Sequence, residues 1–367
     1  MVFTTDHDDG SWSVVSQVRQ SPPVDPTSPY STASLAGKTI LITGGASGFG
    51  AAFARHWAQH GSHVFIGDVN DPLGHSLIAD LRSAHPSQAF HYQHCDVTSW
   101  SDQLSLFKFA LANSPGGVIE GVVAGAGIAD MDNKFDDPRR ASPESDEPRE
   151  PPLKVLDVNL TGVAYTVHLG LFYLARNGTR EDGQPRDRHI MLISSIAGIA
   201  PLPGQTEYTA SKHAVMGLFR ALRGTSWRRG VRVNCLNPYF VDTPILPASG
   251  IAILAGVPKA ELEDVVDAAT RLMADEDVKG RALVIGPKLQ VYDEDGETKL
   301  VAEAPRKVVA KGGRVQAVWE IYAEDFERVE AFVWRYIGMM NVAKNMLGWV
   351  GVVTDLWRLC VSGKKRR

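Results

Sequence analysis

The feature that most constrains the fold is a glycine-rich turn between a short apolar strand and a helix. The strand is predicted at residues 39–42, the turn at residues 43–50 reads Thr-Gly-Gly-Ala-Ser-Gly-Phe-Gly, and a helix follows at residues 51–59. Glycine permits a sharp turn and lets the backbone amides of a helix N-terminus approach a pyrophosphate. The pattern predicts the first βα unit of a dinucleotide-binding sheet. An ordinary tight turn is the alternative.

A second predicted strand, residues 63–67, ends in Asp68, eighteen residues beyond Gly50. A carboxylate at this place accepts hydrogen bonds from the adenosine ribose hydroxyls and repels the additional phosphate of NADP. No arginine follows to neutralise that phosphate, so NAD is the predicted cofactor. Because Val-Asn-Asp-Pro comes next, a turn or helix-capping aspartate is the alternative.

A tyrosine and a lysine lie four residues apart in a segment that is predicted to be helical from about residue 206 to 228. This spacing places Tyr208 and Lys212 on one helix face, one turn apart. The ammonium is expected to lower the pKa of the phenol from about 10, which makes Tyr208 a candidate general acid or base. Ser195 follows a predicted buried strand, residues 189–193, and its hydroxyl can hold a substrate oxygen beside the phenol. A chance surface pair is the alternative for the tyrosine and lysine alone.

The glycine turn, Ser195, Tyr208 and Lys212 together resemble the short-chain dehydrogenase/reductase family over about residues 38–286. The resemblance implies an α/β fold of Rossmann type, with a doubly wound parallel sheet in the order 3-2-1-4-5-6-7. It also implies hydride transfer between a nicotinamide cofactor and an alcohol or ketone. Ser195 would steady the substrate oxygen, Tyr208 would exchange the proton, and Lys212 would bind the nicotinamide ribose.

Further residues take roles from the same resemblance. Asn159 matches a fourth catalytic residue, an asparagine that distorts its helix so that a water connects Lys212 with solvent. Its apolar neighbours predict burial. Asp96 and Val97 match an adenine-binding pair, while the backbone of Val241 and the hydroxyl of Thr243 match contacts to the nicotinamide amide. The predicted cofactor contacts are Gly44, Ser47, Gly48, Phe49, Gly50, Asp68, Asp96, Val97, Gly125, Tyr208, Lys212, Val241 and Thr243.

Two departures from the family pattern stand at the ends of predicted strands. Ala124 and Gly125 occupy the places where the family has asparagines, which puts the side-chain support of the central strand in doubt. Tyr239 follows Pro238 where the family usually has glycine, and it is expected to narrow the nicotinamide pocket.

The composition limits the partners. With 367 residues and 44% hydrophobic content the chain can bury a large core, and its net charge of −4 argues against nucleic acid. The three isolated cysteines, Cys95, Cys235 and Cys360, indicate neither disulfides nor a zinc site, so a reducing compartment fits best. His91 and His94 alternate along a predicted strand without a third ligand, and no metal is predicted.

The domain organisation follows from composition. Residues 1–35 are predicted to be a flexible, proline-bearing tail without a secretory signal, and residues 36–290 the Rossmann domain. Within it, residues 130–150 are expected to be a flexible insert, residues 245–257 a substrate lid, residues 261–274 a helix and residues 281–285 the last strand.

A C-terminal extension, residues 291–367, is predicted to be mostly helical. Two apolar-rich helical stretches are expected between residues 326 and 361, before the basic end at residues 364–367. One interpretation is weak peripheral membrane association, with a location in the cytoplasm that includes the cytosolic face of the endoplasmic reticulum. The other is a helix that packs over the substrate pocket or against a second subunit.

The sequence therefore predicts an NAD-dependent dehydrogenase that oxidises a secondary alcohol of a bulky apolar substrate, of steroid, terpenoid, prostanoid or polyketide type. The tail and the insert resemble those of dehydrogenases from fungal secondary metabolism. An NADPH-dependent ketoreductase and a non-catalytic dinucleotide sensor are the alternatives. The family resemblance implies a homodimer or homotetramer.

Overall fold

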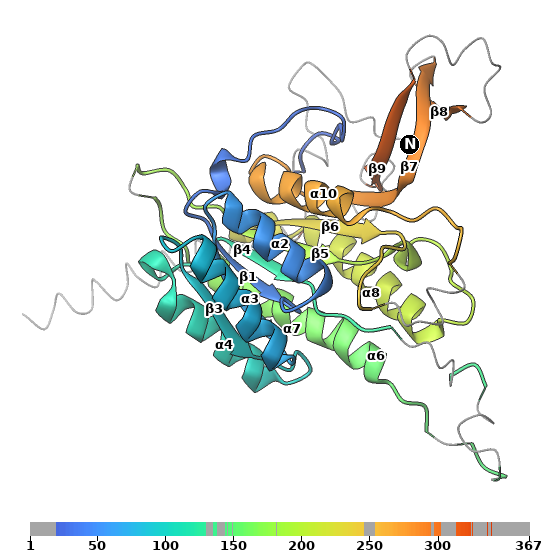
Figure 1. Ribbon diagram of the computed structural model, residues 1–367, viewed down its shortest axis with the longest axis horizontal. Coiled ribbons are helices and arrows are strands. Elements are labelled where there is room, and N and C mark those ends of the chain that lie inside the picture. The colour runs from blue at the N-terminus through green and yellow to red at the C-terminus, as the bar shows by residue number, and fades with distance from the viewer. Residues whose placement is uncertain are drawn as a thin grey trace, which may run out of the picture. The chain divides into compact units, whose positions relative to one another are not determined.

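A nine-stranded sheet forms the centre of the described part of the chain (Figure 1). The computed structural model describes residues 20–129, 135–137, 144, 146–148, 150–180, 182–245, 254–294, 297–301, 313–323, 325, 336 and 339. Residues 19–323 form one compact unit, which contains all nine strands of the sheet. A second unit, residues 1–18 and 324–367, lies outside the described residues except for residues 325, 336 and 339.

Seven parallel strands run in the order β3-β2-β1-β4-β5-β6-β7, which confirms the predicted Rossmann-type order 3-2-1-4-5-6-7. Strands β1, β4, β5 and β6 are buried along their whole length, because helices cover both faces of the sheet. The strands are β1 (Thr39–Thr43), β2 (His63–Asp68), β3 (Phe90–His94), β4 (Gly121–Ala124), β5 (His189–Ile193), β6 (Arg232–Pro238) and β7 (Ala282–Glu294).

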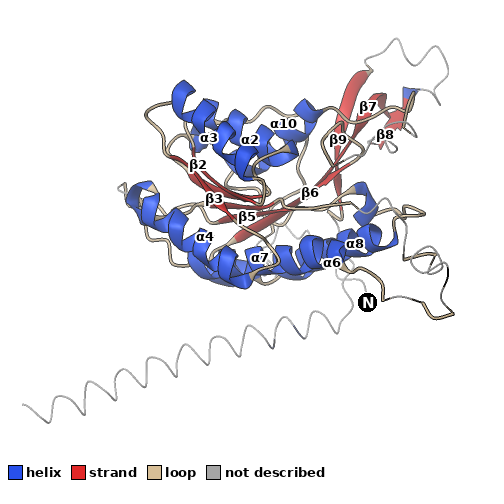
Figure 2. Ribbon diagram, turned by 60° about the horizontal axis from the view of Figure 1, so that its bottom comes forward, coloured by secondary structure: helices blue, strands red, loops and turns tan. Residues whose placement is uncertain are grey.

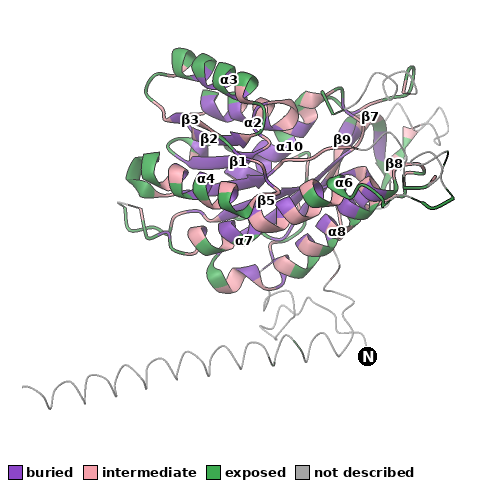
Figure 3. Cartoon of the chain, turned by 90° about the horizontal axis from the view of Figure 1, so that it is seen from below, coloured by how far each residue is buried: buried purple, intermediate pink, exposed green. Residues whose placement is uncertain are grey.

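Two helical layers enclose the sheet (Figure 2). Helices α2 (Gly48–Gln59), α3 (Asp71–Ala84) and α10 (Leu262–Ala274) cover one face. The other face carries α4 (Trp100–Asn113), α6 (Lys154–Leu156), α7 (Val163–Leu174) and α8 (Thr206–Arg223). Each layer buries its own apolar cluster, and the buried residues line the inward faces of the helices (Figure 3).

The stretch Lys154–Leu174 is long and apolar enough to cross a membrane by length and composition. In this fold it comprises α6, a π-helical segment η3 (Asp157–Gly162) and α7. Helix α7 packs on β4, β5 and α4, so the apolar stretch is a core helix of the sheet.

The prediction of a flexible N-terminal tail is wrong for residues 20–35. This segment runs along α10 and the edge of the sheet: Arg271 donates to the carbonyl of Ser28 at 2.6 Å and lies 4.4 Å from the ring of Tyr30. The Tyr30 hydroxyl donates to Asp267 at 2.7 Å. Polar, proline-rich composition predicts disorder only when no other part of the chain supplies partners, and here α10 supplies them.

The prediction of a mostly helical extension is wrong for its described first part. Strand β7 continues to Glu294, and β8 (Glu297–Leu300) and β9 (Arg314–Ile321) pair with it in antiparallel register. A buried ion pair between Arg281 and Glu320, 3.2 Å long, holds β9 in place. Strand β9 supplies backbone partners to an edge that would otherwise be open.

Other predictions fall on residues outside the described part. These are the helical stretches between residues 326 and 361 except for the helical residues 336 and 339, the basic end, most of the insert 130–150, and residues 246–253 of the lid. Membrane association and location stay predictions.

A buried ion network ties the amino ends of three strands together, on the edge of the sheet away from the glycine turn. Asp187, which precedes β5, accepts from Lys38 Nζ at 2.7 Å and from two guanidinium nitrogens of Arg232, each at 2.7 Å. Burial raises the pKa of Asp187, but Arg232 and Lys38 outweigh it and hold that pKa well below its ordinary value. The network stabilises the sheet.

We expect Asp187→Asn to lower the free energy of unfolding by about 3–5 kcal/mol, because it removes the counter-charge of the buried Arg232 and leaves Lys38 paired only with the partly exposed Glu276. The control is Asp80→Asn, which breaks an exposed pair with Arg55 that is worth less than about 1 kcal/mol. Because the folded-state pKa of Asp187 is depressed, its contribution is complete above about pH 4 and is lost as pH falls further. Urea unfolding at pH 7 and pH 3 measures this; equal effects of both substitutions would contradict it.

Candidate active site

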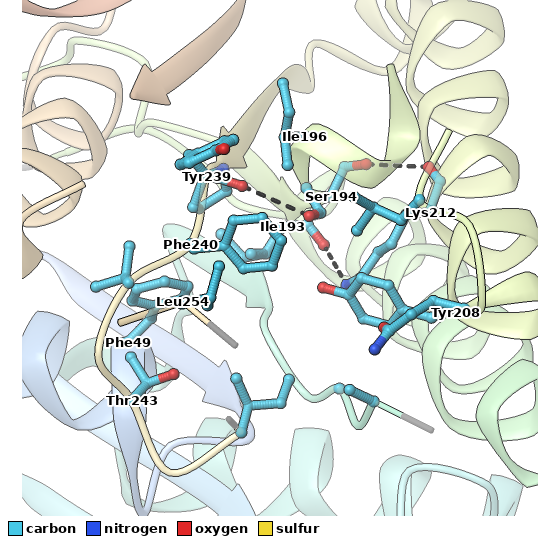
Figure 4. A pocket seen from close by; sticks show the side chains of 18 of the residues that line it. Phe49, Ile193, Ser194, Ile196, Tyr208, Lys212, Tyr239, Phe240, Thr243 and Leu254 are labelled. Carbon is cyan, nitrogen blue, oxygen red and sulfur yellow. Dashed lines mark hydrogen bonds between the residues drawn. The ribbon is translucent and has the colours of Figure 1, made fainter. Parts of the chain in front are cut away.

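Loops at the carboxyl ends of the strands enclose a cavity of about 410 Å³ (Figure 4). This is the edge at which doubly wound sheets bind ligands. The lining comes from the glycine turn, the ends of β4, β5 and β6, and α8. Lining residues with predicted roles are Phe49, Gly125, Ser195, Tyr208, Lys212, Val241 and Thr243.

The structure brings the predicted Ser195, Tyr208 and Lys212 together. Ser195 caps a short 3-10 turn, accepting from the amide of Ala197 at 3.2 Å, and its hydroxyl hydrogen-bonds the Tyr208 phenol. Lys212 Nζ donates to the carbonyl of Ile193 at 3.1 Å and lies 5.6 Å from the centre of the Tyr208 ring. Ser195 and Lys212 are buried and Tyr208 is partly buried, and all three side chains border the same cavity, as an acid-base site requires.

The expected lowering of the Tyr208 pKa by Lys212 is wrong in its net direction. Burial raises the pKa of Tyr208, and the hydrogen bond from Ser195 offsets only part of that rise. Burial also lowers the pKa of Lys212, to about 8. Helical spacing predicts which side chains are neighbours, but it contains no information about how completely they are desolvated.

Asn159 is completely buried in the π-helical segment η3, which is the helix distortion that the family resemblance implies. Its side chain accepts from the amide of Ile128 and donates to the carbonyl of the same residue, each at 2.8 Å. It also donates to Ser211 Oγ at 3.2 Å. A Cβ on Gly127 would lie 3.4 Å from Asn159 Oδ1 and 3.6 Å from Lys212 Nζ. The relay through a water in this space stays a prediction.

The backbone of the glycine turn passes so close to neighbouring backbone that side chains would clash at two of its positions. Gly44 has φ +70°, and a Cβ there would lie 2.5 Å from Ala126 Cα. A Cβ on Gly50 would lie 2.3 Å from the carbonyl oxygen of Gly44. Gly48, with φ +50°, begins the twelve-residue helix α2. The free backbone amides of the first turn of α2 therefore stand beside the glycine turn, where a pyrophosphate is predicted to bind.

Asp68 ties the glycine turn to the next loop. One carboxylate oxygen accepts from the amide of Ala46 and the other from the amide of Asn70, each at 3.0 Å. Asp68 therefore acts as a turn residue. Its carboxylate also lies beside the glycine turn, where the contact with the adenosine ribose is predicted. Asn70, rather than Asp68, caps α3 by accepting from Leu73 at 3.1 Å.

The predicted adenine pair is held by a local turn. Asp96 accepts from the amide of Thr98 at 2.9 Å and from its hydroxyl at 2.8 Å. Val97 is buried, and a Cβ on Gly162 would lie 2.7 Å from its side chain. Their contact with adenine stays a prediction.

Thr43 carries out a function that sequence reasoning missed. Its hydroxyl donates to the carbonyl of Val123 and accepts from the amide of Gly125, each at 3.3 Å. It thereby joins the end of β1 to the end of β4. This bond supplies the side-chain support for the central strand that Ala124 and Gly125 do not provide. A threonine that ends a buried strand was the available signal.

The structure describes only part of the predicted lid, and it describes the residues that were considered as metal ligands. The two described ends of the predicted lid, Ile245 and Leu254, line the cavity. Among the residues that the structure describes, no three His, Cys, Asp or Glu side chains are grouped as a metal site. Cys95 and Cys235 are buried free thiols.

A family model described as short chain dehydrogenase matches residues 38–250. The chain belongs to the short-chain dehydrogenase family. It is therefore an oxidoreductase that depends on NAD or NADP.

Individual relatives agree with this assignment. The 5'-hydroxyaverantin dehydrogenase of Emericella nidulans is 38% identical over 270 residues, covering 70% of this chain and 86% of that protein. The NADP-dependent dehydrogenase M3 of Phoma sp. is 32% identical over 258 residues, covering 68% and 74%. A crystal structure of 3-ketoacyl-(acyl-carrier-protein) reductase from Brucella melitensis, complexed with NADH, matches with a TM-score of 0.57 and 26% identity, covering 68% of this dehydrogenase and 97% of that chain.

We expect Lys212→Met to stabilise this short-chain dehydrogenase while abolishing turnover. With a pKa lowered from 10.5 to about 8, the buried ammonium destabilises the folded state at pH 7 by up to about 3 kcal/mol, since each pKa unit is worth about 1.4 kcal/mol. The lost hydrogen bond to Ile193 offsets part of the gain.

The pH dependence has a definite sign. Between about pH 8 and 10.5 the folded protein binds fewer protons at Lys212 than the unfolded chain, so the Lys212 penalty disappears as pH rises through that window. Thermal melts of the wild type and Lys212→Met should converge there. Lys108→Met, at an exposed position on α4, is the control. A destabilised Lys212→Met at pH 7 would contradict this account.

Proposed function

We propose that this protein is an NAD-dependent dehydrogenase that oxidises a secondary alcohol of a bulky apolar substrate. The observation that carries the proposal is the pair of neighbouring hydroxyls, Ser195 and Tyr208, that line a cavity whose remaining wall is largely apolar. Apolar side chains at that wall include Ile196, Leu202 and Leu254. Such a wall binds the substrate body, while the two hydroxyls bind its oxygen.

The side chains divide the work of moving a proton. Ser195 Oγ holds the substrate oxygen, and Tyr208 Oη takes the alcohol proton. Bound NAD would supply the acceptor for the hydride of the carbinol carbon. Because burial disfavours a charged Tyr208, the phenolate needs the adjacent Lys212 cation as the proton leaves. The Ile193 carbonyl holds that ammonium in place.

The preference for NAD rests on Asp68. Its carboxylate is fixed by two backbone amides at the carboxyl end of β2, and a fixed negative charge disfavours a 2′-phosphate. An NADPH-dependent ketoreductase is the second candidate, because the Phoma relative is NADP-dependent by name. Faster turnover with NADPH than with NADH would favour it.

The substrate is proposed to belong to the steroid, terpenoid, prostanoid or polyketide type, and the role to be secondary metabolism.

Trp100 and Phe172 are exposed on α4 and α7, and they supply apolar surface for a proposed homodimer or homotetramer. Sedimentation equilibrium measures this oligomeric state. Peripheral membrane association through the C-terminus is likewise proposed from the sequence. Flotation with anionic liposomes tests it, with a chain ending at Met340 as the control.

We expect Tyr208→Phe to bind NAD as the wild type does and to lose about 10²- to 10⁴-fold in turnover, because only the ionisable oxygen is removed. Tyr165→Phe is the matched control, since that ring packs on Trp100 at 5.3 Å in the α4–α7 layer. Turnover is followed at 340 nm and NAD binding by calorimetry. Near-normal turnover would refute the assigned role of Tyr208, and absence of turnover in the wild type with every alcohol and ketone would favour a dinucleotide sensor.

We expect Asp68→Ala combined with Val69→Arg to shift the ratio of kcat/KM for NADP over NAD toward NADP, because a repulsive charge is replaced by an attractive one. Val69 is 61% exposed, so an arginine fits there. Both kcat/KM values should also fall, because the amides of Ala46 and Asn70 lose their acceptor. Val69→Arg alone is the control. An unchanged ratio in the double variant would show that Asp68 is only a turn residue.

A further inference from the structure

The wall of the cavity next to Ser195 is aromatic. Ser195 Oγ lies 3.5 Å from the carbonyl oxygen of Pro238, and the next two residues, Tyr239 and Phe240, both line the cavity. Their ring centres are 4.9 Å apart with an interplanar angle of 82°, an edge-to-face pair. Figure 4 shows the two rings on one side of the cavity and Tyr208 on the other.

The main chain fixes this ring pair from two directions. The amide of Tyr239 donates to the carbonyl of Ile285 on β7 at 2.7 Å, and the carbonyl of Phe240 accepts from the amide of Ala260 at 2.9 Å. Both residues are only partly buried, so each leaves ring surface facing the cavity. A rigid aromatic surface therefore stands beside the position that Ser195 and Tyr208 assign to the substrate oxygen.

Tyr239 departs from the usual family pattern. It occupies the position at which the resemblance to the family implies glycine, which would leave this part of the wall without a side chain. The tyrosine therefore adds ring surface to the cavity wall near Ser195, and the predicted narrowing of the nicotinamide pocket stays a prediction.

We propose, on the basis of the proposed function, that the substrate carries an aromatic ring within one or two bonds of its carbinol carbon, and that this ring packs against Tyr239 and Phe240. Aromatic rings attract one another edge to face or offset at 4.5–7 Å between centres, beyond what area burial contributes. A saturated ring of similar size is at least as apolar but lacks the charge distribution of the aromatic face and edge. The cavity should therefore select an aryl carbinol or aryl ketone over its cycloalkyl equivalent.

The test compares two ketones that differ only in ring saturation, acetophenone and cyclohexyl methyl ketone. Their dissociation constants are measured by calorimetry on the full-length protein saturated with NAD. We expect acetophenone to bind about twofold to tenfold more tightly, the range that one aromatic contact supplies. Tyr239→Leu and Phe240→Leu keep an apolar side chain and should bring the affinity ratio toward one. Tyr239→Phe keeps the ring and should preserve the ratio.

Several outcomes would overturn the aryl preference: no measurable binding of acetophenone, equal affinities in the wild type, or a ratio unchanged in both leucine variants. If the leucine variants weaken NAD binding and leave the ketone ratio unchanged, the rings contact the cofactor and the proposal fails. Oxidation of 1-phenylethanol is measured separately. Aryl-selective binding without turnover would contradict the proposed function but support the aryl preference. Turnover with equal ketone affinities would support the proposed function but contradict the aryl preference.

Discussion

The rest of the site depends on two hydrogen bonds between the side chain of Asn159 and the backbone of Ile128. They attach the π-helical turn η3 to the loop that follows β4. A third bond reaches Ser211, whose hydroxyl donates to the carbonyl of Tyr208 at 2.7 Å. The helix that carries Tyr208 and Lys212 is thereby fixed against the loop that contacts the glycine turn at Gly44 and Ala126. Each buried group left without its partner would cost about 1–3 kcal/mol, so the fully bonded arrangement is strongly favoured.

The buried charges at the two edges of the sheet differ in how well they are neutralised. At the amino edge, Asp187 pairs with Lys38 and Arg232, so buried charges are neutralised and hydrogen-bonded. At the carboxyl edge, Lys212 is buried with only a carbonyl acceptor described for its ammonium, and the neighbouring Tyr208 phenol is desolvated. Burial makes each charged form unfavourable, which is the condition that acid-base chemistry exploits. The amino edge stabilises a fold that tolerates this unfavourable arrangement.

The sequence predicts the strand order, and it predicts that Ser195, Tyr208 and Lys212 lie together, for a physical reason. Strands that are buried on both faces require continuous apolar runs, and the turns that follow them carry the glycines and polar residues that the site uses. What the sequence does not contain is tertiary context. The partners of Ser28 and Ser21 are Arg271 on α10 and Arg281 directly before β7, more than 200 positions away, so composition alone indicates a flexible tail. The extent of burial that reverses the pKa shift of Tyr208 is likewise a property of the assembled site. Thr43 supports β4 only because β1 and β4 are neighbours in the sheet.

The proposed reaction in this cavity is hydride transfer from the carbinol carbon of a secondary alcohol to NAD. The most direct measurement uses 1-phenylethanol and other secondary alcohols deuterated at that carbon, with mass spectrometry of the reduced cofactor. Our account predicts that deuterium appears in the cofactor in the wild type, with a primary isotope effect on the chemical step. Reduced cofactor without deuterium, or no reduced cofactor from any alcohol in the series, would contradict the account.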